Sequence, residues 1–237
     1  IRFQRHARRI EYTTDFVPAG RHYRLRAAFP TTIAGGTTHH EIGYGIQQRG
    51  PGEHCAQNWA LLSGASAGLA VLNNGTPGYS TDGGTLLLSL FRAVAMEYKT
   101  TSAGSFAEGV PHRFQYAVVP SSAGAFATVV REGLAFANPP IMVRVEPQLL
   151  GPSGFATDQR NVLISAVRQS GEPRRLFLRL YETAGSAGPV TLWLPAQVRA
   201  VAEADGLERP TAPARPVSGK LQLQLRPFEI CGFLLDT

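Results

Sequence analysis

The chain has 237 residues, of which 43% are hydrophobic, and its formal net charge is +6. This length accommodates one large domain or two domains of roughly 100 to 150 residues each. No stretch approaches the roughly 18 consecutive apolar residues of a membrane span, so a transmembrane segment is excluded and no membrane partner is expected.

The positive charge raises the possibility of an acidic partner. The cations are spread along the chain, and the densest group (Arg2, Arg5, Arg8 and Arg9) lacks the interleaved aromatic residues that single-strand binders use. A solvated strand face is the preferred interpretation of this group, and nucleic-acid binding is not expected. Because the chain starts without an initiator methionine or a signal peptide, we expect a processing boundary there, and no localisation is assigned.

Period-two alternation of apolar and polar residues predicts most of the secondary structure. Turn-forming residues separate these runs, and the chain contains 25 glycines and 17 prolines. The clearest predicted strands are 9–16, 23–29, 112–118 and 221–226; the clearest turns are 73–78, 81–84, 169–173 and 184–189.

The single helical candidate, "FATVVREGLAF" at 126–136, is short and weak. Parallel sheets need crossover helices that the sequence does not offer, so an all-β antiparallel β-sandwich is the expected fold class. A stretch with two prolines and two glycines, "EPQLLGPSGFATDQRN" at 146–161, predicts a domain boundary near residue 153. Residues 1–153 then form the larger sandwich and residues 154–237 the smaller one.

Few residues point to catalysis. The two cysteines, Cys55 and Cys231, are far apart and lack a partner motif, which argues against a disulfide scaffold or a structural zinc site. His112 lies on the apolar side of its predicted strand, where a hydrogen-bonded core histidine is favoured over a ligand. Glycoside hydrolysis requires two flanking carboxylates, but no pair stands out, and most of the scattered glutamates are expected at the surface: Glu41, Glu53, Glu108, Glu182 and Glu229.

The stretch "TTHHEIGYG" at 37–45 raises the question of a metal site. On a strand, His39 and Glu41 point to one face and His40 to the other. The two histidines therefore cannot close on one ion, and His39 with Glu41 supplies two ligands at best. No metal ligand is predicted here.

The longest distinctive stretch, "GLAVLNNGTPGYSTDGGTLLLSLFRAV" at 68–94, resembles the C-terminal region of glycoside hydrolase family 38, the α-mannosidase family. Further pieces that resemble this family occur in its order: "RLRAAFP" at 24–30, "HEIGYGIQQR" at 40–49, Trp59, "HRFQYAVVP" at 112–120, "NPP" at 138–140, "LFLRLYETAG" at 176–185 and "LRPFEICGFLL" at 225–235.

The resemblance implies a portion of a galactose mutarotase-like supersandwich, followed by a small β-sandwich. It also implies a parent enzyme that is a retaining, zinc-dependent α-mannosidase-like hydrolase acting on an α-mannoside. In that family the zinc ion and the carboxylate nucleophile belong to an upstream catalytic domain, so no catalytic or metal residue is carried over to this chain. The upstream domain is the expected partner, zinc is expected only there, and the chain alone is expected to be inactive.

The resemblance also suggests that the sandwich lends side chains to the edge of the substrate cleft. Arg92 is the first candidate, because it shares parity with the apolar row Leu86, Leu88 and Leu90 and would need a partner or an interface there. The alternative is a strand-end arginine with its head group in water. The other substrate-cleft candidates are Asn73 and Tyr79, which turn formation alone also explains.

Two other classes of function stay open. An autonomous carbohydrate-binding module would use Trp59 and Trp193 as platforms, although Trp193 alternates with Leu192 and Leu194 and so faces away from a core. A polyanion binder is the third alternative, and it would be retained on heparin in a salt-dependent manner.

Overall fold

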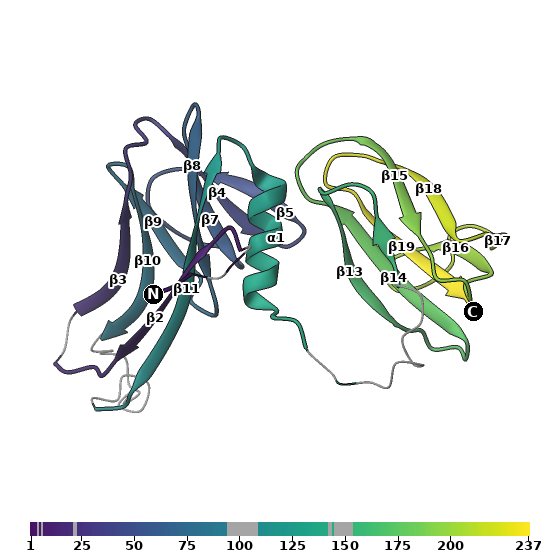
Figure 1. Ribbon diagram of the computed structural model, residues 1–237, viewed down its shortest axis with the longest axis horizontal. Helices are drawn as coiled ribbons and strands as arrows, with labels where there is room; N and C mark the ends of the chain where they lie inside the picture. Colours follow the sequence, from purple (N-terminus) through teal and green to yellow (C-terminus); the bar gives the residue numbers. More distant parts are fainter. Residues whose placement is uncertain (4, 6, 21–22, 94–108, 142–143, 145–153) are drawn as a thin grey trace, which may run out of the picture. The chain divides into compact units, whose positions relative to one another are not determined.

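The computed structural model describes residues 1–3, 5, 7–20, 23–93, 109–141, 144 and 154–237. The chain divides into two compact units, Ile1–Pro140 and Ile141–Thr237 (Figure 1). The boundary predicted near residue 153 lies outside the described residues, as does Glu108. Among the described helices, none is both long and apolar enough to cross a membrane.

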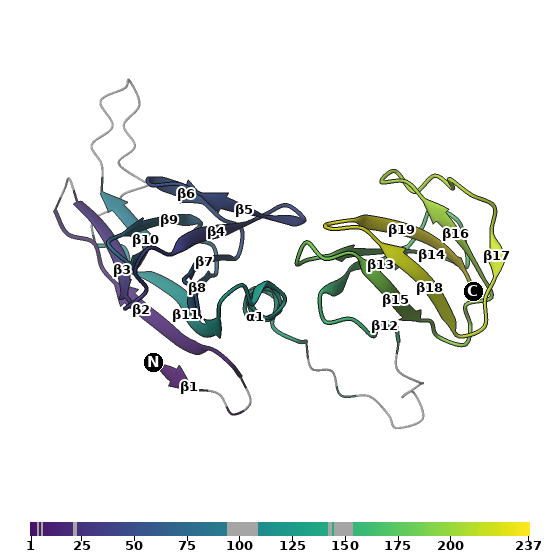
Figure 2. The same cartoon turned by 90° about the horizontal axis from the view of Figure 1, so that it is seen from above.

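The first unit is built from two antiparallel sheets that face each other (Figure 2). The seven-stranded sheet has the order β1-β2-β11-β8-β7-β4-β5 and the four-stranded sheet the order β3-β10-β9-β6. The strands of the first sheet are β1 (Arg2–Phe3), β2 (Ile10–Phe16), β11 (His112–Ser122), β8 (Ala67–Asn73), β7 (Trp59–Ser63), β4 (Thr37–Ile42) and β5 (Gly45–Arg49). Those of the second are β3 (Tyr23–Pro30), β10 (Thr85–Ala93), β9 (Gly78–Asp82) and β6 (Glu53–Cys55).

Alternation places one face of each sheet in a shared core. Because successive side chains of a strand point to opposite faces, the inward positions of both sheets are apolar. Fully or almost fully buried members of this core are Ala60, Val71, Tyr79, Leu86, Leu88 and Val118. The aromatic rings of Tyr12 and Tyr116 stack at its margin with centroids 5.5 Å apart. This core holds the two sheets together, as the sequence pattern predicts.

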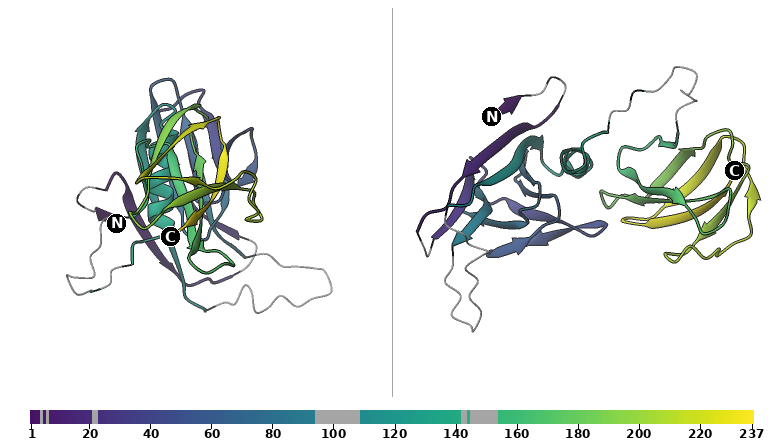
Figure 3. Two further views of the ribbon diagram at one scale, coloured as in Figure 1. Left: turned by 90° about the vertical axis from the view of Figure 1, so that its right-hand side faces the viewer. Right: turned by 90° about the horizontal axis from the view of Figure 1, so that it is seen from below.

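Part of the other face of the seven-stranded sheet is also covered, because helix α1 (Phe126–Ala137) lies on it and contacts β7, β8 and β11 (Figure 3). The helical candidate of the sequence is therefore confirmed as a twelve-residue helix. It buries Val129, Val130 and Gly133, and a Cβ atom on Gly133 would stand 2.8 Å from Cδ1 of Trp59. The indole of Trp59 occupies the space that the glycine leaves.

Arg9 ties this helix to the sheet. Its Nε donates to Glu11 Oε1 at 2.8 Å and its Nη1 to Glu132 Oε2 of α1 at 3.0 Å, and its guanidinium lies 5.7 Å from the ring centroid of Phe136. The prediction of a solvated arginine run is wrong for Arg9, whose side chain is only 13% exposed. A partly buried arginine of this kind needs carboxylate partners, and the helix supplies one of them.

The second unit is a smaller sandwich of a three-stranded sheet, β12-β15-β18, and a five-stranded sheet, β13-β14-β19-β16-β17 (Figure 2). Its core lies between the sheets and includes Leu178, Leu180, Leu192, Phe233 and Leu235. The strands are β12 (Ala156–Thr157), β13 (Val162–Gln169), β14 (Arg175–Glu182), β15 (Gly188–Trp193), β16 (Ala200–Ala204), β17 (Arg215–Pro216), β18 (Lys220–Leu225) and β19 (Ile230–Asp236). The predicted all-β fold, a sandwich followed by a smaller sandwich, is confirmed.

The predicted turns lie where the sequence places them. Residues 73–78 join β8 to β9, 169–173 join β13 to β14, and 184–189 join β14 to β15. Thr85 pairs with Asp82 across a two-residue turn, and both turn residues have positive φ, 51° at Gly83 and 81° at Gly84. A two-residue hairpin of this type requires positive φ at both positions, which glycine adopts without steric penalty.

Candidate functional site

Asn73 and Tyr79, two of the three substrate-cleft candidates, lie together inside the first unit. Asn73 is 2% exposed and Tyr79 is fully buried. Asn73 Nδ2 donates to the carbonyl of Gln57 and to the Tyr79 hydroxyl, both at 2.9 Å, and this hydroxyl donates to the carbonyl of Val71 at 3.1 Å. Burial, more than any neighbouring charge, raises the pKa of Tyr79. Both side chains are thus used to join β8, β9 and the loop before β7.

Asn73 also builds the turn that follows it. Its Oδ1 accepts the backbone N–H groups of Gly75 and Thr76, each at 3.1 Å. A side-chain amide that binds backbone groups two and three residues ahead is a turn-forming arrangement. Turn formation therefore accounts for Asn73, and neither buried side chain reaches the surface.

Arg92 lies elsewhere, and the expectation that it shares a face with Leu86, Leu88 and Leu90 is wrong. The pairing of β10 with β3 shifts between Ser89 and Phe91, which leaves Leu90 as an extra residue. A bulge of this kind reverses the alternation beyond it. Ala93 is consequently buried, and Arg92 is exposed on the outer face of the four-stranded sheet.

Two more arginines share that outer face. Arg92 pairs directly with Arg24 of β3, and Arg26 pairs with Ser89 of β10. Like charges opposite each other on a sheet repel, so acidic groups near these three side chains would be stabilising. Without them the three guanidinium groups form a strongly basic surface. We call Arg24, Arg26 and Arg92 the basic corner.

One carboxylate approaches the basic corner. Glu53 of β6 accepts a hydrogen bond from Ser89 Oγ at 3.0 Å and forms an ion pair with Arg24 Nη2 at 2.8 Å. Burial alone would raise the pKa of Glu53, but the Ser89 hydrogen bond and the charges of Arg24 and Arg26 outweigh it and lower the pKa. Among the residues that the structure describes, one carboxylate stands beside three guanidinium groups, so positive charge is in excess at this corner.

The "TTHHEIGYG" stretch forms β4 and the turn that follows it, and the predicted division of its faces is confirmed. His40 is 1% exposed and points into the core between the sheets, where its Nδ1 lies 3.2 Å from the carbonyl of Cys55. His39 points to the other face, with its ring 5.1 Å from that of Phe126 in α1. Within the described part of the chain, no group of three or more His, Cys, Asp or Glu side chains is placed to hold a metal ion. These residues therefore do not fit a zinc site.

Two glutamates correct the expectation of surface carboxylates. Glu41 is 6% exposed and Glu182 is 1% exposed. Glu41 Oε2 accepts the backbone N–H of Asn58 at 2.8 Å, and burial raises its pKa more than this and other hydrogen bonds lower it. Glu182 belongs to the second unit and is surrounded by backbone N–H donors.

Residues 64–68 read Gly-Ala-Ser-Ala-Gly, which has the G-x-S-x-G spacing of a serine nucleophile elbow. Such an elbow requires a strand, a sharp turn and a helix. Here the segment is the hairpin between β7 and β8, and Gly64 N–H donates to the carbonyl of Ala67 at 2.8 Å. The spacing marks a hairpin and gives Ser66 no catalytic surroundings of that type.

The two tryptophans have opposite environments. Trp59 is fully buried beneath α1 and provides no platform for a sugar, so this part of the carbohydrate-binding alternative is wrong. Trp193 is 44% exposed on β15, whereas the adjacent Leu192 and Leu194 are buried. The predicted outward direction of Trp193 is confirmed.

The fold defines the class of protein: an all-β protein made of two antiparallel β-sandwiches in succession. Comparison with known families gives its affiliation. Residues 1–98 match the profile described as "Glycosyl hydrolases family 38 C-terminal domain". Residues 161–233 match "Glycosyl hydrolases family 38 C-terminal beta sandwich domain".

Relatives named as alpha-mannosidases support the same family. The chain is 31% identical over 235 residues to human alpha-mannosidase 2C1, covering 90% of this chain and 22% of that protein. It is 25% identical over 244 residues to alpha-mannosidase G of Dictyostelium discoideum, covering 95% of this chain and 22% of that protein. The chain thus spans about a fifth of the length of the curated relatives it matches.

Solved structures share the fold. A glycosyl hydrolase family 38 protein from Enterococcus faecalis superimposes with a TM-score of 0.79 at 22% identity, covering 97% of this chain and 28% of that one. An alpha-mannosidase from Enterococcus faecalis V583 does so with a TM-score of 0.76 at 21% identity, covering 98% and 27%. The chain belongs to glycoside hydrolase family 38 and is a C-terminal β-sandwich region of that family.

Proposed function

We propose that this chain is the non-catalytic sandwich region of a retaining, zinc-dependent, α-mannosidase-like hydrolase, and that its basic corner borders the active-site cleft of an upstream catalytic domain. The relatives named as alpha-mannosidases support the class of the parent enzyme. The matched region is 22% of the length of each, which leaves room for a separate catalytic domain. Zinc and the nucleophile are assigned to that domain.

The observation that carries the proposed role is the position of Arg92. The bulge at Leu90 turns its side chain outward beside Arg24 and Arg26, where Glu53 is the carboxylate that approaches the group within the described part of the chain. A guanidinium presents five N–H donors in a rigid plane and suits carboxylates or paired oxygen atoms. An exposed group of this kind fits either an acidic edge of the catalytic domain or the hydroxyl groups of a bound sugar.

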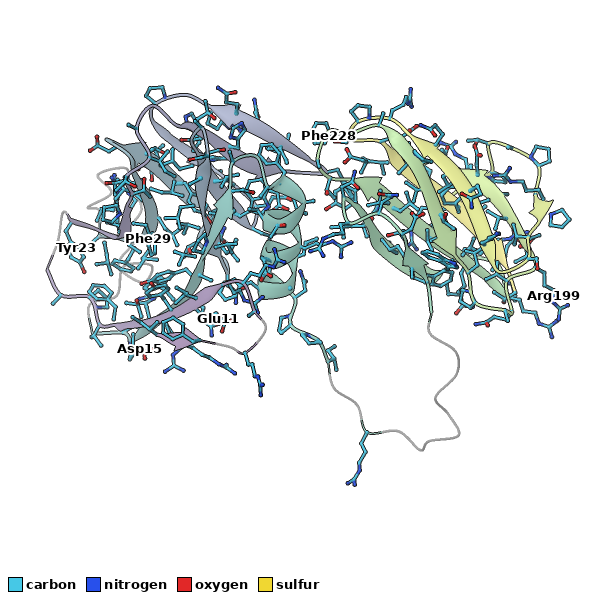
Figure 4. All side chains as sticks on the ribbon, turned by 45° about the horizontal axis from the view of Figure 1, so that its top comes forward. Glu11, Asp15, Tyr23, Phe29, Arg199 and Phe228 are labelled. Carbon is cyan, nitrogen blue, oxygen red and sulfur yellow. The ribbon has the colours of Figure 1, made fainter. Side chains whose placement is uncertain are left out.

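The test is the turnover of an aryl α-mannoside and of an α-linked mannotriose by the full-length enzyme carrying Arg92→Ala. We expect kcat/KM to fall about tenfold, which corresponds to about 1.4 kcal/mol, the size of a hydrogen bond to a charged group. Arg199→Ala is the matched control, because Arg199 is an exposed arginine of the second unit, at the opposite end from Phe228 (Figure 4). Unchanged kinetics in Arg92→Ala would remove the cleft role.

A second measurement concerns the chain alone. The 237-residue chain should not hydrolyse an aryl α-mannoside with or without added zinc, since the proposal assigns all catalytic groups to the upstream domain. Robust, zinc-dependent hydrolysis by the chain alone would contradict the assignment of all catalytic groups to the upstream domain. The result is independent of the Arg92 experiment.

A further inference from the structure

The outward face of the three-stranded sheet in the second unit carries an exposed aromatic platform. Strand β15 alternates between buried Val190 and Leu192 and outward Pro189, Thr191 and Trp193. Trp193 remains 44% exposed, which is a large apolar surface to leave in water. It lies on a regular strand, so its position is set by the sheet and not by a loop.

Polar side chains of the neighbouring strand continue this platform. In the register of β15 with β18, Trp193 lies opposite Lys220, Thr191 opposite Gln222, and Pro189 opposite Gln224. Thr191 Oγ1 donates to Gln222 Oε1 at 3.3 Å, which joins the two strands on this face. Four residues of a strand span about 13 Å, so the row from Trp193 to the level of Gln224 has the length of a short oligosaccharide.

A cavity lies at the far end of the row. It is half open to solvent and has a volume of about 340 Å³, within the range of small-molecule sites, and Gln222 and Gln224 form part of its wall. Other lining side chains include Glu203, Thr211, Arg215 and Glu229. β18 has β15 as its single partner among the described strands, so its second edge is directed toward this space.

The charges of the cavity are mixed. Glu203 and Glu229 supply negative charge and Arg215 supplies positive charge, and Glu229 is itself paired with Arg226 at 2.8 Å. Cys231 also lines the cavity, and its pKa is raised to about 11 mainly by burial and then by Glu229 and Glu203. The charges are too balanced to select a strongly anionic ligand such as a nucleic acid. Planar amide, carboxylate and guanidinium groups instead match pairs of hydroxyl groups.

We propose that this surface, from Trp193 along Gln222 and Gln224 to the cavity, is an accessory binding site for a neutral oligosaccharide. The indole offers an apolar face to the C–H face of a pyranose ring, and the amides offer both donors and acceptors to its hydroxyl groups. The site belongs to the small sandwich and is assigned independently of the cleft role of Arg92. Its effect would be to hold a glycan chain near the enzyme without taking part in bond cleavage.

The two tryptophans of the chain make the test direct. Trp59 is buried and Trp193 is exposed, so acrylamide quenches the fluorescence of Trp193 preferentially in the 237-residue chain. We titrate with α-linked mannotriose, cellotriose and chitotriose, and expect at least one to protect Trp193 from quenching in a saturable manner. If none of the three binds, the proposal is overturned.

Variants locate the binding. Trp193→Ala should weaken the affinity measured by calorimetry about tenfold or more, Trp193→Phe should restore part of it, and Gln222→Ala should weaken it less than Trp193→Ala. Leu207→Ala is the matched control, because Leu207 is another exposed apolar residue of this unit, 72% exposed. The Leu207→Ala variant should bind the oligosaccharide with the same affinity as the unaltered chain. Binding that is unchanged in Trp193→Ala, or lost equally in Leu207→Ala, would contradict the site. Far-ultraviolet circular dichroism confirms that each variant is folded.

Discussion

The carboxylate of Glu182 accepts the backbone N–H of Phe228 at 2.9 Å and so joins two loops that are 46 positions apart in sequence. The same carboxylate accepts the N–H groups of Ala184, Gly185 and Ser186 at 2.7 to 3.1 Å. Phe228 has a positive φ of 55°, an uncommon conformation for a residue with a side chain. A Cβ atom on Gly185 would lie 2.9 Å from the ring of Phe228. Glu182 thus stabilises a strained, closely packed pair of loops.

Replacement of this carboxylate tests its role. Glu182→Gln replaces one carboxylate oxygen by an NH₂ group, which cannot accept a hydrogen bond from the surrounding backbone donors. It also weakens the hydrogen bond that Asn161 Nδ2 donates to Glu182 Oε1 at 2.8 Å. We expect a loss of about 1 to 3 kcal/mol in the free energy of unfolding, measured with urea. Glu172→Gln is the control, because the Glu172 side chain is 66% exposed and exposed ion pairs contribute little. Equal stability of both variants would show that the hydrogen bonds to Glu182 are not needed.

The pH dependence of the Glu182 contribution has a definite sign. Burial alone would raise the pKa of Glu182, but the hydrogen bonds from Phe228, Asn161, Ala184 and Ser186 outweigh it and lower the pKa below the ordinary 4.5. A carboxyl with a lowered folded pKa stabilises the fold above the unfolded pKa and loses this effect as pH falls through the folded value. The difference in stability between the unaltered chain and Glu182→Gln should therefore shrink below about pH 4.5. A difference that stays constant down to pH 2 would contradict this account.

Glu41 should behave in the opposite way. Burial raises its pKa above the ordinary 4.5, so ionisation disfavours the folded state and stability falls as pH rises from the unfolded pKa through the folded one. Glu41→Gln keeps an oxygen for the N–H of Asn58 and removes the buried charge. We expect this variant to be as stable as the unaltered chain or more stable, by up to about 1 kcal/mol at pH 7. A large loss of stability would show that the charge itself is required.

The contact between α1 and the sheet gives a packing test. Gly133→Ala improves intrinsic helix propensity by about 1 kcal/mol, but its Cβ would meet Cδ1 of the buried Trp59 at 2.8 Å. Overpacking against a rigid ring costs about 1 to 3 kcal/mol, so the net effect should be a loss of about 1 kcal/mol with a shift in Trp59 fluorescence. Gly206→Ala is the control, since nothing lies within 4 Å of a Cβ there. A stabilised Gly133→Ala variant would mean that the helix moves freely over Trp59.

Much of this fold follows from period-two patterning. The alternation at 9–16, 23–29, 112–118 and 221–226 predicts β2, β3, β11 and β18 within a few residues. The same rule fails at Arg92, because one extra residue, Leu90, reverses the alternation. A bulge leaves the composition of a strand unchanged, so the outward position of Arg92, and with it the basic corner, is visible only once β3 and β10 are paired.

The buried carboxylates show a second limit. Charge predicts that most glutamates of the chain lie at the surface, because an isolated carboxylate is costly to bury, and Glu41 and Glu182 are the exceptions. Backbone N–H groups replace water around both side chains. Almost every residue type carries a backbone N–H, so the sequence does not show where such donors converge on a carboxylate. Trp193 is the contrasting case, because its position between Leu192 and Leu194 predicts its exposure correctly.

His40 provides the last prediction, in a separate pH range. Burial is the main reason why its pKa falls from 6.5 to about 4, and the hydrogen bond to the Cys55 carbonyl partly opposes the change. The rings of His54 and Tyr79 lie 5.9 and 5.7 Å away between the sheets, and the charges of His54, Arg49 and His39 also disfavour a protonated His40. The folded chain therefore keeps His40 neutral at pH values where the unfolded chain takes up a proton.

Since the folded pKa is the lower one, stability should fall as pH decreases from 6.5 to about 4 and should lose no more from this group below that value. We expect a loss of about 1 to 3 kcal/mol over this range. His40→Gln, whose amide can donate to the Cys55 carbonyl but does not titrate, should remove this part of the slope. Urea unfolding at pH 7, 5.5 and 4.5 measures it, and identical slopes in the two chains would show that His40 takes up its proton equally in the folded and unfolded states.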